Sequence, residues 1–159
     1  MSAASNTLEN KVLDHVLRNT SYSQPSVLKV ALFAGAASDV LIALESGSGA
    51  RTAGNWGYYE ITGGAYVRTT IQFAAASGGT ATSNGANATF STADANYNNE
   101  AASGSTITCI AVMDGAFTPD GSTTHTGNVL FYGQLDNAKE VLSGDTFQIT
   151  AGNLTISLA

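Results

Sequence analysis

The chain has 159 residues, of which 11% are charged, and its twelve acidic and six basic residues give a formal net charge of −6. One domain is expected at this length, and the acidic balance argues against nucleic-acid binding, which needs a basic patch. The single cysteine, Cys109, excludes an intramolecular disulfide, and no stretch approaches the ~18 continuous apolar residues of a membrane span. The N-terminus lacks the pattern of a signal peptide, so we expect an intracellular protein that leaves the cell by assembly or lysis.

One helix is predicted over Asn6–Arg18. Asn6 and Glu9 have the spacing of a capping box, in which the two side chains reciprocally satisfy backbone N–H groups. An apolar stripe runs along this segment at Leu8, Val12 and Val16. Because so short a helix is marginal alone in water, the stripe is expected to dock against the rest of the domain or a neighbouring subunit.

The period changes after Pro25, and seven segments predict strands. They are 27–34, 66–73, 86–90, 106–113, 129–135, 146–150 and 154–158. Segment 106–113 is apolar on both faces, which favours a central place in a sheet. Segment 40–44 fits a helical turn or a strand, whereas 46–55, 77–82 and 114–127 have the composition of loops.

One short N-terminal helix and seven or eight strands predict a mainly β fold. We expect an antiparallel β-sandwich, jelly-roll or immunoglobulin-like, with residues 1–25 as a helical arm and 26–159 as the sandwich domain. Strand edges are normally protected by charge, and this chain has little charge to place there. The composition therefore favours a protein that buries these surfaces in an oligomer or a larger assembly.

No residue pattern predicts an enzyme, a cofactor or a bound metal. His15 and His125 lie far apart in sequence, and the chain lacks the Gly-X-Ser-X-Gly motif of a hydrolase. Cys109 falls inside a predicted strand, where a free thiol behaves as a small apolar group. The loop with Asp114 and Asp120 is a weak alternative site for calcium.

Trp56, Tyr58 and Tyr59 form the one aromatic cluster of the sequence. Such rings beside Asn and Glu side chains can stack on a sugar, so a carbohydrate-binding adhesin is one hypothesis. The alternative is that some of the rings cap the core while the others fill a subunit contact.

Several segments resemble a family of small structural proteins of tailed bacteriophages. The resemblance rests on 8–16 (LENKVLDHV), 63–68 (GGAYVR), 83–85 (SNG) with 89–90, 127–133 (GNVLFYG), 143–147 (SGDTF) and 151–158 (AGNLTISL). Members of this family are often labelled tail-fibre or virion proteins, and some resemble capsid decoration (cement) proteins. The resemblance implies a non-enzymatic protein located in the virion.

The leading hypothesis is a cement protein that forms a trimer on the capsid and stabilises contacts between capsomers. Its expected partners are the major capsid protein and other virion proteins, with no nucleic acid, membrane or cofactor. A tail or tail-fibre component is the alternative. The residues expected at the interface are Leu8, Val12, Val16, Trp56, Tyr58 and Tyr59.

Overall fold

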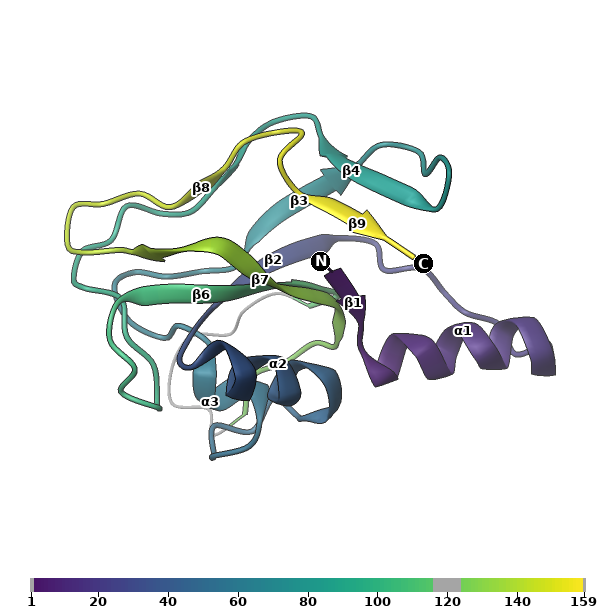
Figure 1. Ribbon diagram of the computed structural model, residues 1–159, viewed down its shortest axis with the longest axis horizontal. Coiled ribbons are helices and arrows are strands. Elements are labelled where there is room, and N and C mark those ends of the chain that lie inside the picture. The colour runs from purple at the N-terminus through teal and green to yellow at the C-terminus, as the bar shows by residue number, and fades with distance from the viewer. Residues whose placement is uncertain (1, 116–123, 159) are drawn as a thin grey trace.

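The computed structural model describes residues 2–115 and 124–158 (Figure 1). Within these ranges the helices are α1 (Asn6–Arg18), α2 (Ala37–Ser46) and α3 (Trp56–Tyr59). The strands are β1 (Ser2–Ala4), β2 (Leu28–Ala34), β3 (Thr69–Phe73), β4 (Thr80–Asn84), β5 (Ala88–Thr89), β6 (Thr106–Met113), β7 (Val129–Glu140), β8 (Gln148–Ile149) and β9 (Thr155–Ser157). No helix in these ranges is both long and apolar enough to cross a membrane.

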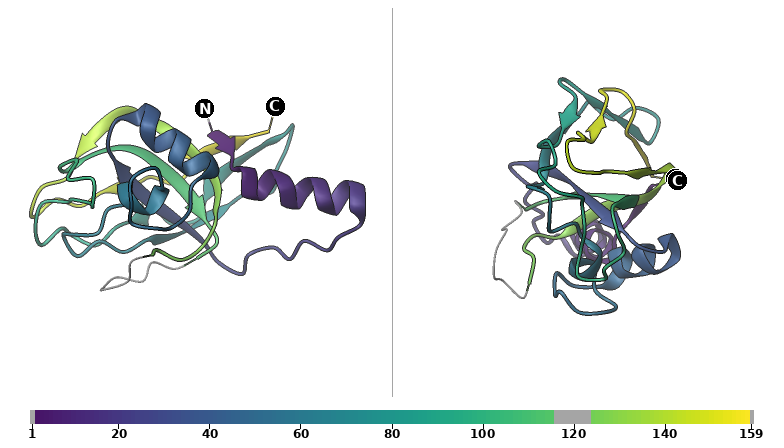
Figure 2. Two further views of the ribbon diagram at one scale, coloured as in Figure 1. Left: turned by 90° about the horizontal axis from the view of Figure 1, so that it is seen from below. Right: turned by 90° about the vertical axis from the view of Figure 1, so that its left-hand side faces the viewer.

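Seven strands form one antiparallel sheet in the order β1-β7-β6-β2-β3-β4-β9. The two end strands, β1 and β9, approach each other, so the sheet is nearly closed into a barrel (Figures 1 and 2). A separate pair joins β5 to β8. The mainly β prediction is confirmed. A two-sheet sandwich is not confirmed, because a single curled sheet wraps around its own interior.

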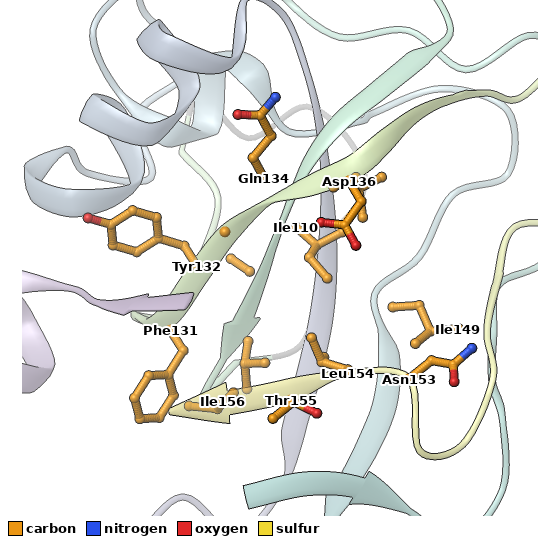
Figure 3. Close-up of a pocket in the computed structure, with 14 residues that line it drawn as sticks. Ile110, Phe131, Tyr132, Gln134, Asp136, Ile149, Asn153, Leu154, Thr155 and Ile156 are labelled. Atoms are coloured by element: carbon orange, nitrogen blue, oxygen red, sulfur yellow. The ribbon is translucent and has the colours of Figure 1, made fainter. Parts of the chain in front are cut away.

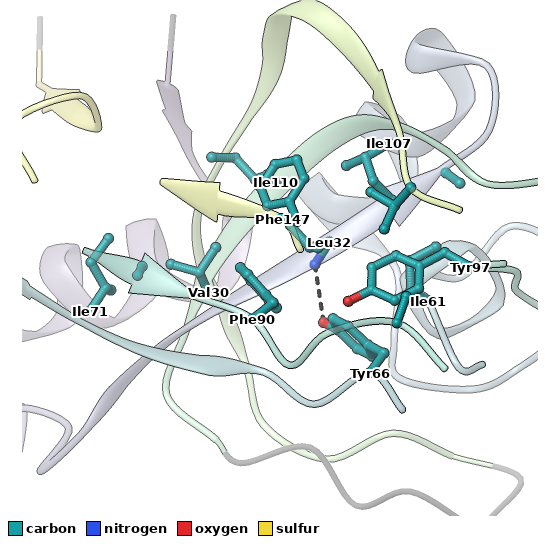
Figure 4. Close-up of a cluster of buried hydrophobic side chains, with 14 of the residues drawn as sticks. Val30, Leu32, Ile61, Tyr66, Ile71, Phe90, Tyr97, Ile107, Ile110 and Phe147 are labelled. Atoms are coloured by element: carbon teal, nitrogen blue, oxygen red, sulfur yellow. Dashed lines mark hydrogen bonds between the residues drawn. The ribbon is translucent and has the colours of Figure 1, made fainter. Parts of the chain in front are cut away.

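The two central strands of the sheet are buried on both faces. Val30 and Leu32 of β2 face the barrel interior, where they join the main core shown in Figure 4. Ala31 and Phe33 face outward, where they pack with Val40, Ala43 and Leu44 of α2. β6 lies between β7 and β2 and alternates in the same way, so its predicted central place is confirmed.

Helix α1 has the predicted bounds but a different N-cap. Ser5, and not Asn6, precedes the helix with extended backbone, and its hydroxyl oxygen accepts a hydrogen bond from the Leu8 N–H. The same hydroxyl donates to the Val129 carbonyl, and the Ser5 N–H donates to the Leu130 carbonyl at 3.0 Å. The start of α1 is therefore fastened to β7, and the helix then projects away from the barrel (Figures 1 and 2).

Other element predictions need correction. Segment 40–44 belongs to helix α2, and residues 80–82, expected in a loop, belong to strand β4. The strand expected over 66–73 begins at Thr69, because the preceding residues 63–68 turn through Gly64 and Ala65 with positive φ. That turn leaves Val67 exposed and Arg68 buried, the reverse of the faces that simple alternation predicts.

Candidate functional site

The charged groups most deeply enclosed in the described chain form a cluster beside α3. This buried ion cluster consists of Glu60, Tyr66, Arg68 and His125, and each residue is at most 4% exposed. Glu60 follows the single turn of α3, Arg68 precedes β3, and His125 lies in the segment that leads into β7. The neighbouring segments of Glu60 and Arg68 are thus joined at one carboxylate to the segment of His125, which is distant in sequence.

Every contact in the cluster has good hydrogen-bond geometry. Arg68 donates to both Glu60 oxygens, from Nε at 2.6 Å and from Nη2 at 2.8 Å. The His125 Nδ1 lies 2.6 Å from Glu60 Oε2, and the Tyr66 hydroxyl donates to Glu60 Oε1 at 3.1 Å. The remaining Arg68 nitrogen, Nη1, donates to the carbonyls of Gly115 and Thr126.

The electrostatics of the cluster favour a charged Glu60. Burial by itself raises the pKa of Glu60, but the hydrogen bonds and charges of Arg68 and His125 outweigh burial and hold that pKa below its usual value. Burial, followed by the charge of Glu60, raises the pKa of Tyr66 well above normal, so this phenol stays neutral. Glu60 is fully enclosed and paired with Arg68 and His125, so its charge is compensated within the chain.

The other residues considered for chemistry do not come together in one site. His125 belongs to the cluster, whereas His15 lies on exposed α1 with its Nδ1 3.0 Å from the Thr20 carbonyl oxygen. Cys109 is fully buried under α2, and burial raises the pKa of its thiol. No group of three or more metal-ligating side chains occurs in the described ranges. Asp120, one of the two residues of the calcium alternative, lies outside the described residues.

The three aromatic residues do not form one exposed platform. Trp56 is 3% exposed and packs in the outer core, the second cluster of buried residues, which includes Phe33 and Leu44. Its ring lies 5.4 Å from the Arg68 guanidinium and 6.2 Å from the His125 ring. Tyr58 and Tyr59 are half-buried and meet edge to face. Trp56 has the largest ring of the three residues proposed as a sugar platform or subunit contact. That ring is therefore buried by contacts within the chain.

The apolar stripe on α1 divides between the chain and solvent. Leu8 is buried beside the fastened end of the helix. Val12 and Val16 are exposed. Leu13 and Leu17, which lie next to the stripe on the helix surface, are exposed as well. Val16 and Leu17 are 70% and 74% exposed. The two distal turns of α1 thus present an apolar face, here called the helix face, that this chain leaves uncovered.

Two of the grooves on the molecule lie along β9, an end strand of the sheet. The first, of about 290 Å³, lies between β7 and β9 and is shown in Figure 3, with Gln134 and Asp136 from one wall and Asn153 and Thr155 from the other. The second, here called the end groove, measures about 330 Å³. Its lining is apolar apart from Thr80: Leu28, Phe73, Ala76, Gly79, Ala81, Val112, Leu130, Phe131, Ile156 and Leu158.

Sequence reasoning identified the helix face but missed the buried ion cluster and the end groove. Glu60, Arg68 and His125 are isolated in sequence, and no spacing rule relates them. The signal that could have indicated Arg68 is its position in an apolar segment after Gly63 and Gly64, a turn able to reverse the expected face. The end groove gathers residues from six strands and the β3–β4 turn and has no signature of its own in the sequence.

Comparison with known proteins gives one family. A family model described as Podophage GP4 fiber I protein gp80 matches residues 3–157. This range includes α1, the barrel apart from Ser2, the buried ion cluster and all but the last residue of the end groove lining. A search of curated proteins found no match.

Proposed function

The chain belongs to the Podophage GP4 fiber I protein gp80 family, and on this premise we propose that it is a structural subunit of a virion fibre. A protein of this family is a virion component, so its location is the virion. Fibre families are structural and typically have no enzymatic activity. The match over residues 3–157 is the observation that carries the proposal.

The fold supports a structural role. The most enclosed charged groups of the described chain are used to join three segments, and their burial keeps them from any substrate. The uncovered helix face and the end groove are surfaces that a partner would cover. In the proposed fibre the arm of residues 1–25 makes subunit contacts, the body of residues 26–159 forms the fibre wall, and the partners are copies of this chain and other virion proteins.

A fibre role takes the place of capsid decoration as the leading hypothesis, because the family description names a fibre. A homotrimer is kept as the proposed oligomer. An adhesin that stacks sugars on Trp56, Tyr58 and Tyr59 is not favoured, since the Trp56 ring is enclosed in the outer core.

Deleting the gene is expected to remove fibre projections from the particles while the capsid stays as stable as before. Cryo-electron microscopy of the deletion particles measures the projections, and release of DNA on heating measures capsid stability. Complementation with the intact gene should restore the projections. Particles that keep every projection but release DNA at a lower temperature would overturn the fibre proposal in favour of decoration.

A further inference from the structure

Two uncovered apolar surfaces lie at the same end of the molecule. The end groove is lined in part by Leu130 and Phe131, and the Leu130 carbonyl also accepts the hydrogen bond that fastens Ser5. Leu158, which lines the groove, is 66% exposed. The groove therefore lies next to the N-terminal end of α1. The helix face lies on the part of α1 that projects from the body (Figures 1 and 2).

The helix cannot cover the groove of its own chain. β1 pairs with residues 131–133 of β7, Ser5 bonds to Val129 and Leu130, and Leu8 is buried at this junction. From there α1 rises about 1.5 Å per residue, which carries Leu17 roughly 13 Å from Leu8. Because the first turn of the helix is held in place, its last two turns could reach the groove beside that first turn only if backbone hydrogen bonds of the helix were broken.

We propose that the helix face of one copy docks into the end groove of a second copy. Charge supports this pairing, because the groove lining contains no charged residue and Val12, Leu13, Val16 and Leu17 are all uncharged. The basic side chains of α1 have acidic partners outside the helix face. Arg18 pairs with Asp14 at 3.1 Å, and Lys11 lies 4.0 Å from Asp114. The helix face therefore enters an apolar groove without burying an unpaired charge.

The small area of the helix face favours a contact between helix face and groove over a contact between two helix faces. A stable interface removes about 800 Å² per partner from solvent. Two short turns that pack on their own symmetry copy fall well below that value, whereas a helix seated in a groove also buries the groove walls and the exposed Leu158. The contact is head-to-tail, so it closes into a ring, as in a trimer, or continues as a filament.

Complementation between two surface variants tests the proposal with purified full-length protein. Leu17→Asp places a charge on the helix face and leaves the end groove intact, and Leu158→Asp does the reverse. Ile42→Asp is the matched control, because Ile42 is a 66% exposed apolar side chain on α2. All three side chains are exposed, so circular dichroism should show the wild-type fold in each variant.

Sedimentation equilibrium should show that the wild type and Ile42→Asp associate at micromolar concentration. Leu17→Asp and Leu158→Asp alone should each bind themselves about 10- to 100-fold more weakly. A 1:1 mixture of these two variants should form a heterodimer, because one chain supplies an intact helix face and the other an intact groove. A monomeric wild type, a mixture no more associated than its components, or an equal loss in Ile42→Asp would overturn the proposal.

This inference goes beyond the fibre role and does not depend on it. Purified protein that associates as described, from a gene whose deletion leaves every projection in place, would refute the fibre role alone. Loss of projections on deletion, combined with failed complementation between the variants, would refute the helix-to-groove contact alone.

Discussion

Replacing Arg68 by methionine is expected to lower the free energy of unfolding by about 3–5 kcal/mol, because it leaves the buried carboxylate of Glu60 without its main charge partner. Arg68→Met also removes the hydrogen bonds to the Gly115 and Thr126 carbonyls. Urea unfolding followed by circular dichroism measures the change.

Arg18→Met is the control for this prediction. Arg18 pairs with Asp14 on exposed α1, where an i,i+4 ion pair contributes about 0.3–0.5 kcal/mol. Equal losses in Arg18→Met and Arg68→Met would show that burial of the cluster contributes nothing to stability.

The pH dependence of the Arg68→Met effect follows from Glu60. In the wild type its pKa is held below the unfolded value, so this carboxylate contributes stability above about pH 4.3 and loses it as the pH falls toward the folded pKa. Without Arg68, burial raises the pKa of Glu60. As the pH falls, Glu60 of the variant is protonated, and the cost of burying its charge is removed. The difference in unfolding free energy between the two proteins should therefore shrink from pH 7 to about pH 5. A difference independent of pH would contradict the role of Glu60.

Gly49→Ala is expected to destabilise the protein by about 3 kcal/mol, at the upper end of the usual cost of overpacking. A Cβ atom at this position would lie 1.9 Å from the His125 carbonyl oxygen, and backbone atoms cannot yield as a flexible side chain can. The His125 N–H donates to the Gly49 carbonyl at 2.7 Å, so the collision would separate the segment that carries His125 from the loop that leads into α3.

Gly63→Ala is the matched control, because a Cβ atom there meets nothing within 4 Å and its φ is not in the positive range. Thermal unfolding should leave Gly63→Ala within about 0.5 kcal/mol of the wild type. Comparable melting temperatures for the two alanine variants would contradict the close packing inferred at Gly49.

The elements that sequence predicted best are those whose local pattern agrees with their surroundings. Helix α1 has a stripe of apolar residues at helical spacing. Because the helix projects from the body, tertiary packing does not change the residues at which it begins and ends. β6 is apolar on both faces, and its bounds match the prediction because it is a central strand. Strand β4, by contrast, follows two glycines and has little apolar character, so its pairing with β3 and β9 came from tertiary contacts.

The aromatic cluster and the faces of 66–73 show a different limit of the sequence. Trp56 and Tyr58 are neighbours in the chain, yet one is enclosed and the other half-exposed, because α3 is a single turn that directs them to different sides. Positive φ at Gly64 and Ala65 rotated the chain before β3 and moved Arg68 inward. Alternation rules assume continuous strand geometry, which these residues do not have.

The sequence by itself determined the mainly β class, helix α1 with its apolar stripe, the absence of an intramolecular disulfide, and the resemblance to phage structural proteins. These depend on composition, local period and residue order, which the chain carries before it folds. Tertiary structure decided that the strands curl into one nearly closed barrel and that Glu60, Arg68 and His125 meet beside α3. It also decided that the helix face stays uncovered beside an apolar groove. The physical reason is that burial and charge pairing are properties of contacts between distant segments, and a local pattern cannot specify which segments meet.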